Sequence, residues 1–293
     1  MKKRLPFLFL TVVLLMVCLC LPVSADSGPK PSVRVTFPTL EGTYCATLLS
    51  KSAGTGPYGA DKDFLDDAEA RITEKRQLDA FRAFRTYSDP DGYYFIGFVA
   101  TVSASADLVW GYYPPQDFKV LLYDCDTGEM AAGEPQSRYA FASRFEAKQT
   151  ESAGQKQIAV RRSYDYFGQL LQFLLRLAVT LGAEMLLALA FGMLRAGRLR
   201  VVTVVNLLTQ ILLNGTLQFS VYKRGASPYF LPTFYFLAEA AVFVIEAAVY
   251  VFFFARGSVP EDRRLSKAKC VLYALAANAA SFAAGVALWF LLP

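Results

Sequence analysis

The residues best suited to chemistry are carboxyl and amide side chains that interrupt four long apolar segments in the C-terminal half of the chain. Two are carboxyls, Glu184 in the first segment and Glu246 in the third, and amides occupy the second and fourth segments. Carboxylate and amide oxygens together can hold a cation, and a carboxyl in an apolar setting can take up and release a proton. The candidate polar site therefore comprises Glu184, Asn206, Gln210, Asn214, Glu246 and Asn278.

These polar residues share one level along their segments. In each segment one of them lies nine to eleven residues from the basic residue at the segment's end; the four are Glu184, Gln210, Glu246 and Asn278. With a helical rise of 1.5 Å per residue this is a depth of about 15 Å, the middle of a hydrocarbon layer about 30 Å thick. Asn206, Gln210 and Asn214 also recur every four residues, so they form one stripe on a helix.

Two explanations remain open for these polar residues at a common depth. In the first, the amides and carboxyls only join neighbouring helices by hydrogen bonds, each worth about 1 kcal/mol. In the second, Glu184 and Glu246 hold a cation or relay protons, and the amides supply further oxygen atoms. Nearer the opposite end of the segments, Arg176 and Glu239 are expected to form an ion pair.

The four apolar segments are predicted to be transmembrane helices, because each exceeds the roughly 20 residues that a helix needs to cross a bilayer. Their predicted spans within a membrane domain at 164–293 are 167–194, 201–222, 229–255 and 270–292. The loops after the first and third segments are richer in arginine and lysine than the loop between them. By the positive-inside rule those two loops are cytoplasmic, so the N-terminal domain and the C-terminus are extracytoplasmic.

The N-terminus has the features of a secretory signal peptide at residues 1–25. A basic start at residues 2–4 is followed by an apolar run at 5–21, and Val23 and Ala25 provide small residues before a cleavage point. An uncleaved anchor helix is the alternative. Both place the following residues outside the cytoplasm.

Residues 26–163 are predicted to form an extracytoplasmic β-rich domain. Val33, Val35 and Phe37 alternate as on one face of a strand. A helical pattern at 74–87 lies among the strand patterns. The expected fold class is thus a β-sandwich-like domain with one helix, followed by a four-helix transmembrane bundle.

Composition excludes several classes of function. The chain has no histidine, which removes His-based acid–base catalysis and most zinc sites. Residues 26–165 contain 16 basic and 20 acidic side chains and residues 166–293 contain 11 and 5, so the positive charge belongs to membrane flanks and does not indicate nucleic-acid binding. No residue constellation indicates a catalytic site or a cofactor.

Two features of the β-rich domain have alternative interpretations. Cys45 and Cys125 could form a disulfide outside the cytoplasm, but their spacing alone does not show that they are close. Trp110, Tyr112 and Tyr113 could line a groove for a sugar or peptide, or they could pack at the end of a strand.

Five short stretches, at residues 30–33, 46–51, 110–115, 205–210 and 277–282, carry a resemblance to known sequences. They resemble an uncharacterised group of bacterial membrane proteins with a secreted N-terminal β-rich domain and a C-terminal four-helix membrane domain. The resemblance implies this layout and a bacterial plasma membrane. It implies no activity, catalytic residue or ligand.

The function expected from the sequence is that of a non-enzymatic integral membrane protein. Its extracytoplasmic domain would bind a ligand or protein partner, and the membrane bundle would anchor that domain or transduce a signal. The alternative is a small ion- or proton-coupled transport module that uses the midplane glutamates. Four helices offer little room for a transport path, so the alternative calls for a homo-oligomer.

Overall fold

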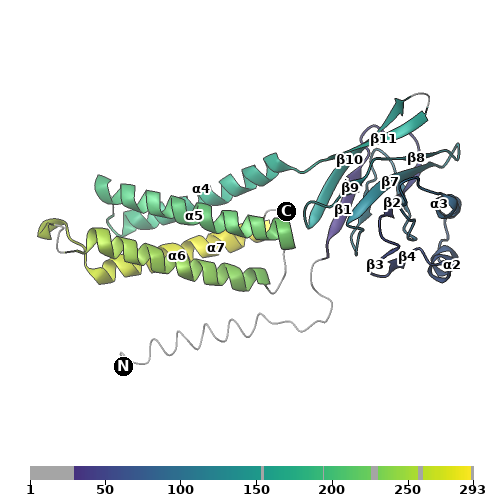
Figure 1. The fold of residues 1–293 in the computed structure, drawn as a ribbon. Coiled ribbons are helices and arrows are strands. Elements are labelled where there is room, and N and C mark those ends of the chain that lie inside the picture. The colour runs from purple at the N-terminus through teal and green to yellow at the C-terminus, as the bar shows by residue number, and fades with distance from the viewer. Residues whose placement is uncertain (1–29, 153–154, 194, 226–229, 257–259, 292–293) are drawn as a thin grey trace. The chain divides into compact units, whose positions relative to one another are not determined.

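The computed structural model describes residues 30–152, 155–193, 195–225, 230–256 and 260–291. It divides into two compact units (Figure 1), one rich in strands and one of four long helices, which confirms the predicted fold class. The β-rich unit covers Pro29–Tyr164 and Tyr222–Gly225. The signal peptide predicted at residues 1–25 lies outside the described residues.

The first sheet of the β-rich unit joins strands that lie far apart in the chain. Its strands follow the order β11 (Gln155–Arg162), β10 (Ala142–Ser152), β1 (Ser32–Thr36) and β6 (Leu108–Trp110). β1 pairs in parallel with β10, with Ser32 opposite Ala142, and the other pairs are antiparallel.

The second sheet is antiparallel and is built around β2 and β7, whose pairing places Tyr44 opposite Asp124 and Ser50 opposite Phe118. Its order is β5 (Ala100–Val102), β2 (Tyr44–Ser50), β7 (Asp117–Asp124) and β8 (Met130–Ala132), and β9 (Gln136–Ser137) also pairs with β7. A small hairpin, β3 (Gly54–Thr55) and β4 (Tyr58–Gly59), stands apart.

The two sheets face each other across one hydrophobic core, so the β-rich unit is a sandwich. Val33 and Val35 of the first sheet belong to the same buried cluster as Ala46 and Leu48 of the second. Trp110 is also fully buried there and stacks on Phe98, so it packs on the core. The predicted strand faces are therefore those that the sandwich buries.

Two helices cover the outer face of the second sheet. α3 (Lys75–Thr86) was expected, and its Phe81 and Phe84 pack with Cys45 and Leu49 of β2. β2 is buried along its whole length because it contacts the facing sheet on one side and the helices on the other. α2 (Lys62–Ala70) was not predicted, because it has only nine residues, fewer than a helical pattern needs to be distinctive in a sequence.

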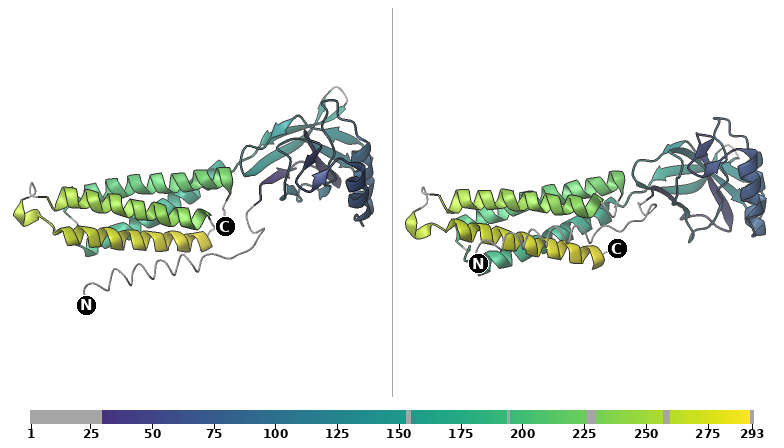
Figure 2. Two further views of the ribbon diagram at one scale, coloured as in Figure 1. Left: turned by 60° about the horizontal axis from the view of Figure 1, so that its bottom comes forward. Right: turned by 90° about the horizontal axis from the view of Figure 1, so that it is seen from below.

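The second unit consists of four helices that run alongside one another (Figure 2). They are α4 (Tyr166–Ala190), α5 (Ala196–Arg224), α6 (Phe230–Phe254) and α7 (Lys267–Leu291), with the short 3-10 helix η1 (Glu261–Arg263) between the last two. The end of α5, from Tyr222 on, belongs to the β-rich unit. All four are long and apolar enough to cross a membrane. α4 begins where the Asp165 side chain accepts a hydrogen bond from the Gly168 amide, and it ends before Gly192, whose φ is 69°.

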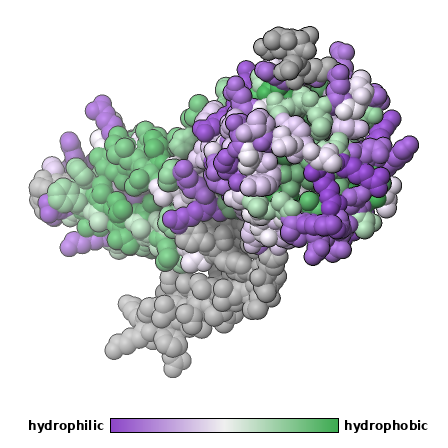
Figure 3. All heavy atoms as spheres, turned by 45° about the vertical axis from the view of Figure 1, so that its right-hand side comes forward, coloured by the Kyte–Doolittle hydropathy of each residue, from purple (hydrophilic) through white to green (hydrophobic). Residues whose placement is uncertain are grey.

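The helical unit carries its apolar side chains outside and its polar ones inside. Leu186, Leu212 and Leu237 are more than 60% exposed, whereas Glu184 and Glu246 are fully buried. Figure 3 shows hydrophobic residues over the surface of the bundle and mostly hydrophilic ones over the β-rich unit. This distribution is suited to a lipid bilayer, where apolar side chains face lipid and polar groups are satisfied within the protein.

Small side chains on α7 allow it to pack closely against both α4 and α6. Ala274, Ala277 and Ser281 are fully buried on this face. A Cβ atom on Gly285 would lie 2.5 Å from the Tyr235 hydroxyl, so the face has little room for larger residues. The face predicted from Ala277, Ser281 and Gly285 is thus the packing face of α7.

The substitution Ala277→Leu should destabilise the bundle by roughly 1–3 kcal/mol, because overpacking forces apart helices that are already in contact. Thermal unfolding of the purified protein in detergent would measure the loss. The matched control is Ala279→Leu, which adds the same side chain to an exposed position of the same helix. Equal effects of the two substitutions would contradict the packing described for α7.

Candidate functional site

The polar residues predicted from the sequence come together inside the helical bundle. Glu184 comes from α4, Asn206 and Gln210 from α5, Glu246 from α6 and Asn278 from α7, and each is at most 5% exposed. Asn214, one turn beyond Gln210, is half-buried. We call Glu184, Asn206, Thr209, Gln210, Asn214, Glu246, Tyr250, Asn278 and Ser281 the bundle cluster.

Glu246 ties three helices together through its carboxyl group. Its Oε1 atom lies 2.7 Å from the Thr209 hydroxyl of α5, and its Oε2 atom accepts a 2.6 Å hydrogen bond from the Asn278 amide of α7. Both neighbours are uncharged, so neither supplies a positive charge to balance an ionised Glu246.

Thr209 can bond to Glu246 in either protonation state. Its hydroxyl oxygen lies 3.0 Å from the Val205 carbonyl and 3.1 Å from the Asn206 carbonyl, as well as close to Glu246. A hydroxyl has one hydrogen and can also accept. If Glu246 is ionised, Thr209 donates to it; if Glu246 is protonated, Glu246 donates to Thr209, which donates to its own helix. A proton can therefore come and go without movement of the heavy atoms.

Glu184 belongs to a second group of hydrogen bonds centred on Gln210. The Gln210 Nε2 atom donates to Glu184 Oε1 at 3.3 Å and to the Ser281 hydroxyl at 3.0 Å. Its Oε1 atom accepts from the Asn214 amide at 3.0 Å. The two groups of bonds adjoin, because Thr209 and Gln210 are consecutive and because Glu184 and Glu246 are close enough to repel each other when charged.

Three buried atoms of the cluster have no hydrogen-bond partner among the described residues. Two are the acceptors Glu184 Oε2 and Asn278 Oδ1, and the third is the donor Asn206 Nδ2. Asn206 is held through its oxygen, which accepts a 2.5 Å bond from Tyr250. Unpaired acceptors beside two carboxyls leave places for a proton or a cation to bind.

No lysine or arginine among the described residues forms an ion pair or a hydrogen bond with Glu184 or Glu246. Within the same part of the chain, no three His, Cys, Asp or Glu side chains gather as a metal site would require. An oxygen site of two carboxyls and amides, or a proton site, is the chemistry that this donor set supports.

Arg176 and Glu239 were expected to form an ion pair nearer the other end of the bundle. Glu239 is 7% exposed and its Oε2 atom has no hydrogen-bond partner among the described residues. The Tyr235 hydroxyl, one turn away, lies beside this carboxyl, and Arg176 exerts its charge on the same tyrosine. The ion pair itself stays a prediction.

Hydroxyl groups are the members of the site that sequence reasoning missed. Thr209 and Tyr250 were not considered, and Ser281 was noted only for its small size. Thr209 lies three residues from Asn206, and Tyr250 lies one turn from Glu246. A search for hydroxyls on the same face as each predicted residue would have found both.

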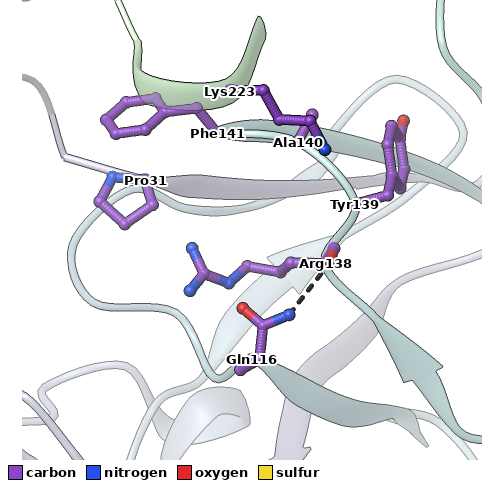
Figure 4. Close-up of a pocket in the computed structure, with 7 residues that line it drawn as sticks. All are labelled: Pro31, Gln116, Arg138, Tyr139, Ala140, Phe141 and Lys223. Carbon is purple, nitrogen blue, oxygen red and sulfur yellow. Dashed lines mark hydrogen bonds between the residues drawn. The ribbon is translucent and has the colours of Figure 1, made fainter.

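The β-rich unit has a pocket of about 360 Å³ beside the start of β10 (Figure 4). The Arg138 side chain lies next to Gln116, whose amide donates to the Arg138 carbonyl at 3.1 Å. The Arg138 Nε atom is buried without a hydrogen-bond partner among the described residues, and burial lowers the pKa of this guanidinium. The pocket is lined by Pro31, Gln116, Arg138, Tyr139, Ala140, Phe141 and Lys223.

Cys45 and Cys125 lie side by side as free thiols, with their sulfur atoms 3.5 Å apart. Cys45 is buried in β2, and burial, together with the neighbouring Cys125 thiol, raises its pKa to about 12. Burial also raises the pKa of Cys125. A disulfide, with sulfur atoms about 2 Å apart, needs only a small approach of the two side chains.

Reduced Cys45 should react with iodoacetamide roughly a thousandfold more slowly in the folded protein than in urea, because only the thiolate is nucleophilic and its pKa is raised from 9.0 to about 12. After mild oxidation, peptide mapping should recover Cys45 linked to Cys125. A Cys125→Ser variant, which cannot form the link, is the control. Rapid alkylation of Cys45 in the folded chain would contradict the burial described here.

The bundle and the β-rich unit reproduce the layout that the resemblance implied. No family model matches the chain, and no curated protein or solved structure matches it either.

Proposed function

We propose that the four-helix unit is a small proton-coupling module of a membrane, in which Glu184 and Glu246 hold an exchangeable proton. One observation carries the proposal: two fully buried carboxyls bond to the consecutive residues Thr209 and Gln210 and have only uncharged hydrogen-bond partners among the described residues. Two uncompensated negative charges in an apolar bundle would be very costly. At least one proton, or a cation in its place, must therefore reside at the pair.

The groups that face the carboxyls are suited to exchange of this proton. Glu184 faces Glu246, Gln210 and Ser281, and Glu246 faces Thr209 and Asn278. The other titratable groups near the pair are Glu239, Tyr250 and Tyr273. The Thr209 hydroxyl reverses its hydrogen bond as Glu246 gains or loses the proton, so both states are stabilised.

Helix packing alone does not explain well why these residues are carboxyls. Hydrogen bonding between helices is achieved by neutral Ser, Thr, Asn or Gln without any charge to bury. One oxygen atom of Glu184 has no hydrogen-bond partner among the described residues. A side chain whose only role was to join helices would be expected to have both oxygen atoms bonded. The carboxyls therefore support a role in binding.

The pH dependence of unfolding tests the proposal. The free energy of unfolding of the wild-type protein should fall as the pH rises, because the carboxyls keep a proton in the folded state and lose it on unfolding. The decrease is about 1.4 kcal/mol per pH unit for each proton released on unfolding. The double variant Glu184→Gln/Glu246→Gln should show a flatter profile. Thermal unfolding in detergent measures both.

The control Glu261→Gln/Asp262→Asn removes two exposed carboxyls of η1 and should keep the wild-type profile. Stabilisation by one added cation at high pH, lost in the Glu184→Gln/Glu246→Gln variant, would identify a cation site in place of the proton. Equal pH and cation dependence in the wild type and that variant would sink the proposal.

The proposed setting is a bacterial plasma membrane, with the β-rich unit and the C-terminus outside. The basic residues at 195–200 and 256–269 support this orientation through the positive-inside rule, and the signal peptide predicted at residues 1–25 supports it independently. Four helices are few for a transport path, so a homo-oligomer is part of the proposal. The bacterial assignment rests on the sequence resemblance alone.

A second proposal concerns the β-rich unit, which the sequence favoured as a ligand- or partner-binding domain. The pocket at Arg138 supports it, because a partly buried guanidinium with an unpaired Nε atom is suited to an anionic group. Pro31 and Tyr139 add apolar surface beside it (Figure 4). The ligand class proposed is a carboxylate that bears an apolar ring.

Benzoate is the probe for this pocket, and its uncharged analogue benzamide is the matched ligand control. Benzoate should bind the full chain more tightly than benzamide, and Arg138→Gln should weaken benzoate binding by about tenfold through loss of a charge-assisted hydrogen bond. Isothermal titration calorimetry measures both. Arg144→Gln, at an exposed position, should have no effect; an equal loss in both variants would contradict the proposal.

A further inference from the structure

A second pocket, of about 300 Å³, lies within the helical unit at its arginine-rich end. It is bounded by the first turns of α5, the last turn of α6 and η1. The lining residues are Arg195, Gly197, Arg198, Val201, Phe253, Phe254 and Arg263. One side is therefore cationic and the other apolar.

The cationic side has more positive charge than its neighbours compensate. Arg195 and Arg198 are one helical turn apart, close enough for each to feel the other's charge. The Arg198 guanidinium donates a 2.5 Å hydrogen bond to the Arg263 carbonyl. A carbonyl is uncharged, so this bond does not neutralise the positive charge of Arg198. Among the described residues no acidic side chain forms an ion pair with Arg195 or Arg198, whereas the Asp262 carboxylate lies 3.5 Å from the Arg263 guanidinium.

The position of these arginines favours an anion further. Arg195 directly precedes α5, and its carbonyl accepts hydrogen bonds from Arg198 and Leu199 in the first helical turn. The N-terminus of a helix carries a partial positive charge, which adds to that of the side chains. An anion between the two arginines would remove their mutual repulsion.

The apolar side identifies what kind of anion fits. Phe253 is 52% exposed beside the arginines, and Phe254 and Val201 continue the apolar wall into the bundle. A free inorganic anion would leave this wall uncovered. An amphiphile with a phosphate at one end and a hydrocarbon chain at the other would meet both sides.

We propose that this pocket binds an anionic phospholipid, with its phosphate between Arg195 and Arg198 and an acyl chain along Phe253. Basic pockets between transmembrane helices are suited to lipid headgroups of this type. The proposal is independent of the proton site, because the pocket shares no residue with the bundle cluster.

Lipid titrations of the detergent-purified full chain test the proposal, with the midpoint of thermal unfolding as the readout. The probes are phosphatidylglycerol, the zwitterionic phosphatidylcholine and inorganic phosphate. Phosphatidylglycerol should raise the midpoint of the wild type, and the other two should not. Arg195→Gln should raise the phosphatidylglycerol concentration needed for half of the effect by about tenfold, because it removes one charge-assisted phosphate contact.

Arg200→Gln is the matched control, since Arg200 is also exposed, lies near the N-terminus of α5 and is outside the pocket. It should leave the titration unchanged, and an equal loss in both variants would overturn the pocket as the binding site. An effect of inorganic phosphate as large as that of phosphatidylglycerol would overturn the lipid. Phe253→Ala, which keeps every charge, should abolish the advantage of long-chain over short-chain phosphatidylglycerol; an unchanged advantage would likewise overturn it.

Discussion

The carboxyl group of Glu246 is the point on which the helical unit depends, because it joins α5, α6 and α7 through two hydrogen bonds at one level. In an apolar medium no water replaces a lost partner, so a buried polar group must be satisfied within the protein. The side chains around it are arranged accordingly. Asn278 also bonds its own helix through the Ala274 carbonyl, and Gln210 connects the neighbouring carboxyl on α4 to Ser281 on α7.

This arrangement explains why one helix has so many small residues. α7 must approach both α4 and α6 for its Asn278 and Ser281 side chains to reach their partners, and Ala274 and Ala277 keep the backbones close. Packing and hydrogen bonding thus depend on the same face of one helix. A change in either property would disturb the other, and the polar level is a structural as well as a chemical feature.

The sequence predicted the polar level well because depth in a helix follows from simple counting. Glu184, Gln210, Glu246 and Asn278 were placed together by their distance from basic residues, and the structure does bring them together. The hydrogen-bond partners were not predictable in the same way. Spacing from Asn206 and Glu246 indicates the helix face of Thr209 and Tyr250, but only the packing of the helices shows that Thr209 bonds Glu246 and that Tyr250 bonds Asn206.

In the β-rich unit, faces were predictable and connections were not. The alternation of Val33 and Val35 showed which side of β1 is buried. Nothing local shows that β1 pairs with β10, because strand pairing depends on contacts between distant residues. α2 was missed for another reason: it has only nine residues, and it is stabilised by an Asp61 N-cap and by packing on the sheet, which its short sequence does not reveal.

The parallel pairing of β1 with β10 has a consequence for the order in which the chain can fold. Ser32 lies near the beginning of the described chain, and its partner Ala142 is made long afterwards. The first sheet therefore cannot be completed before β10 has been synthesised, and until then the edge of β1 that pairs with β10 stays unpaired. Only β11 separates that moment from the start of α4. During synthesis, the sandwich can therefore be completed only shortly before α4, the first of the four apolar helices, is made.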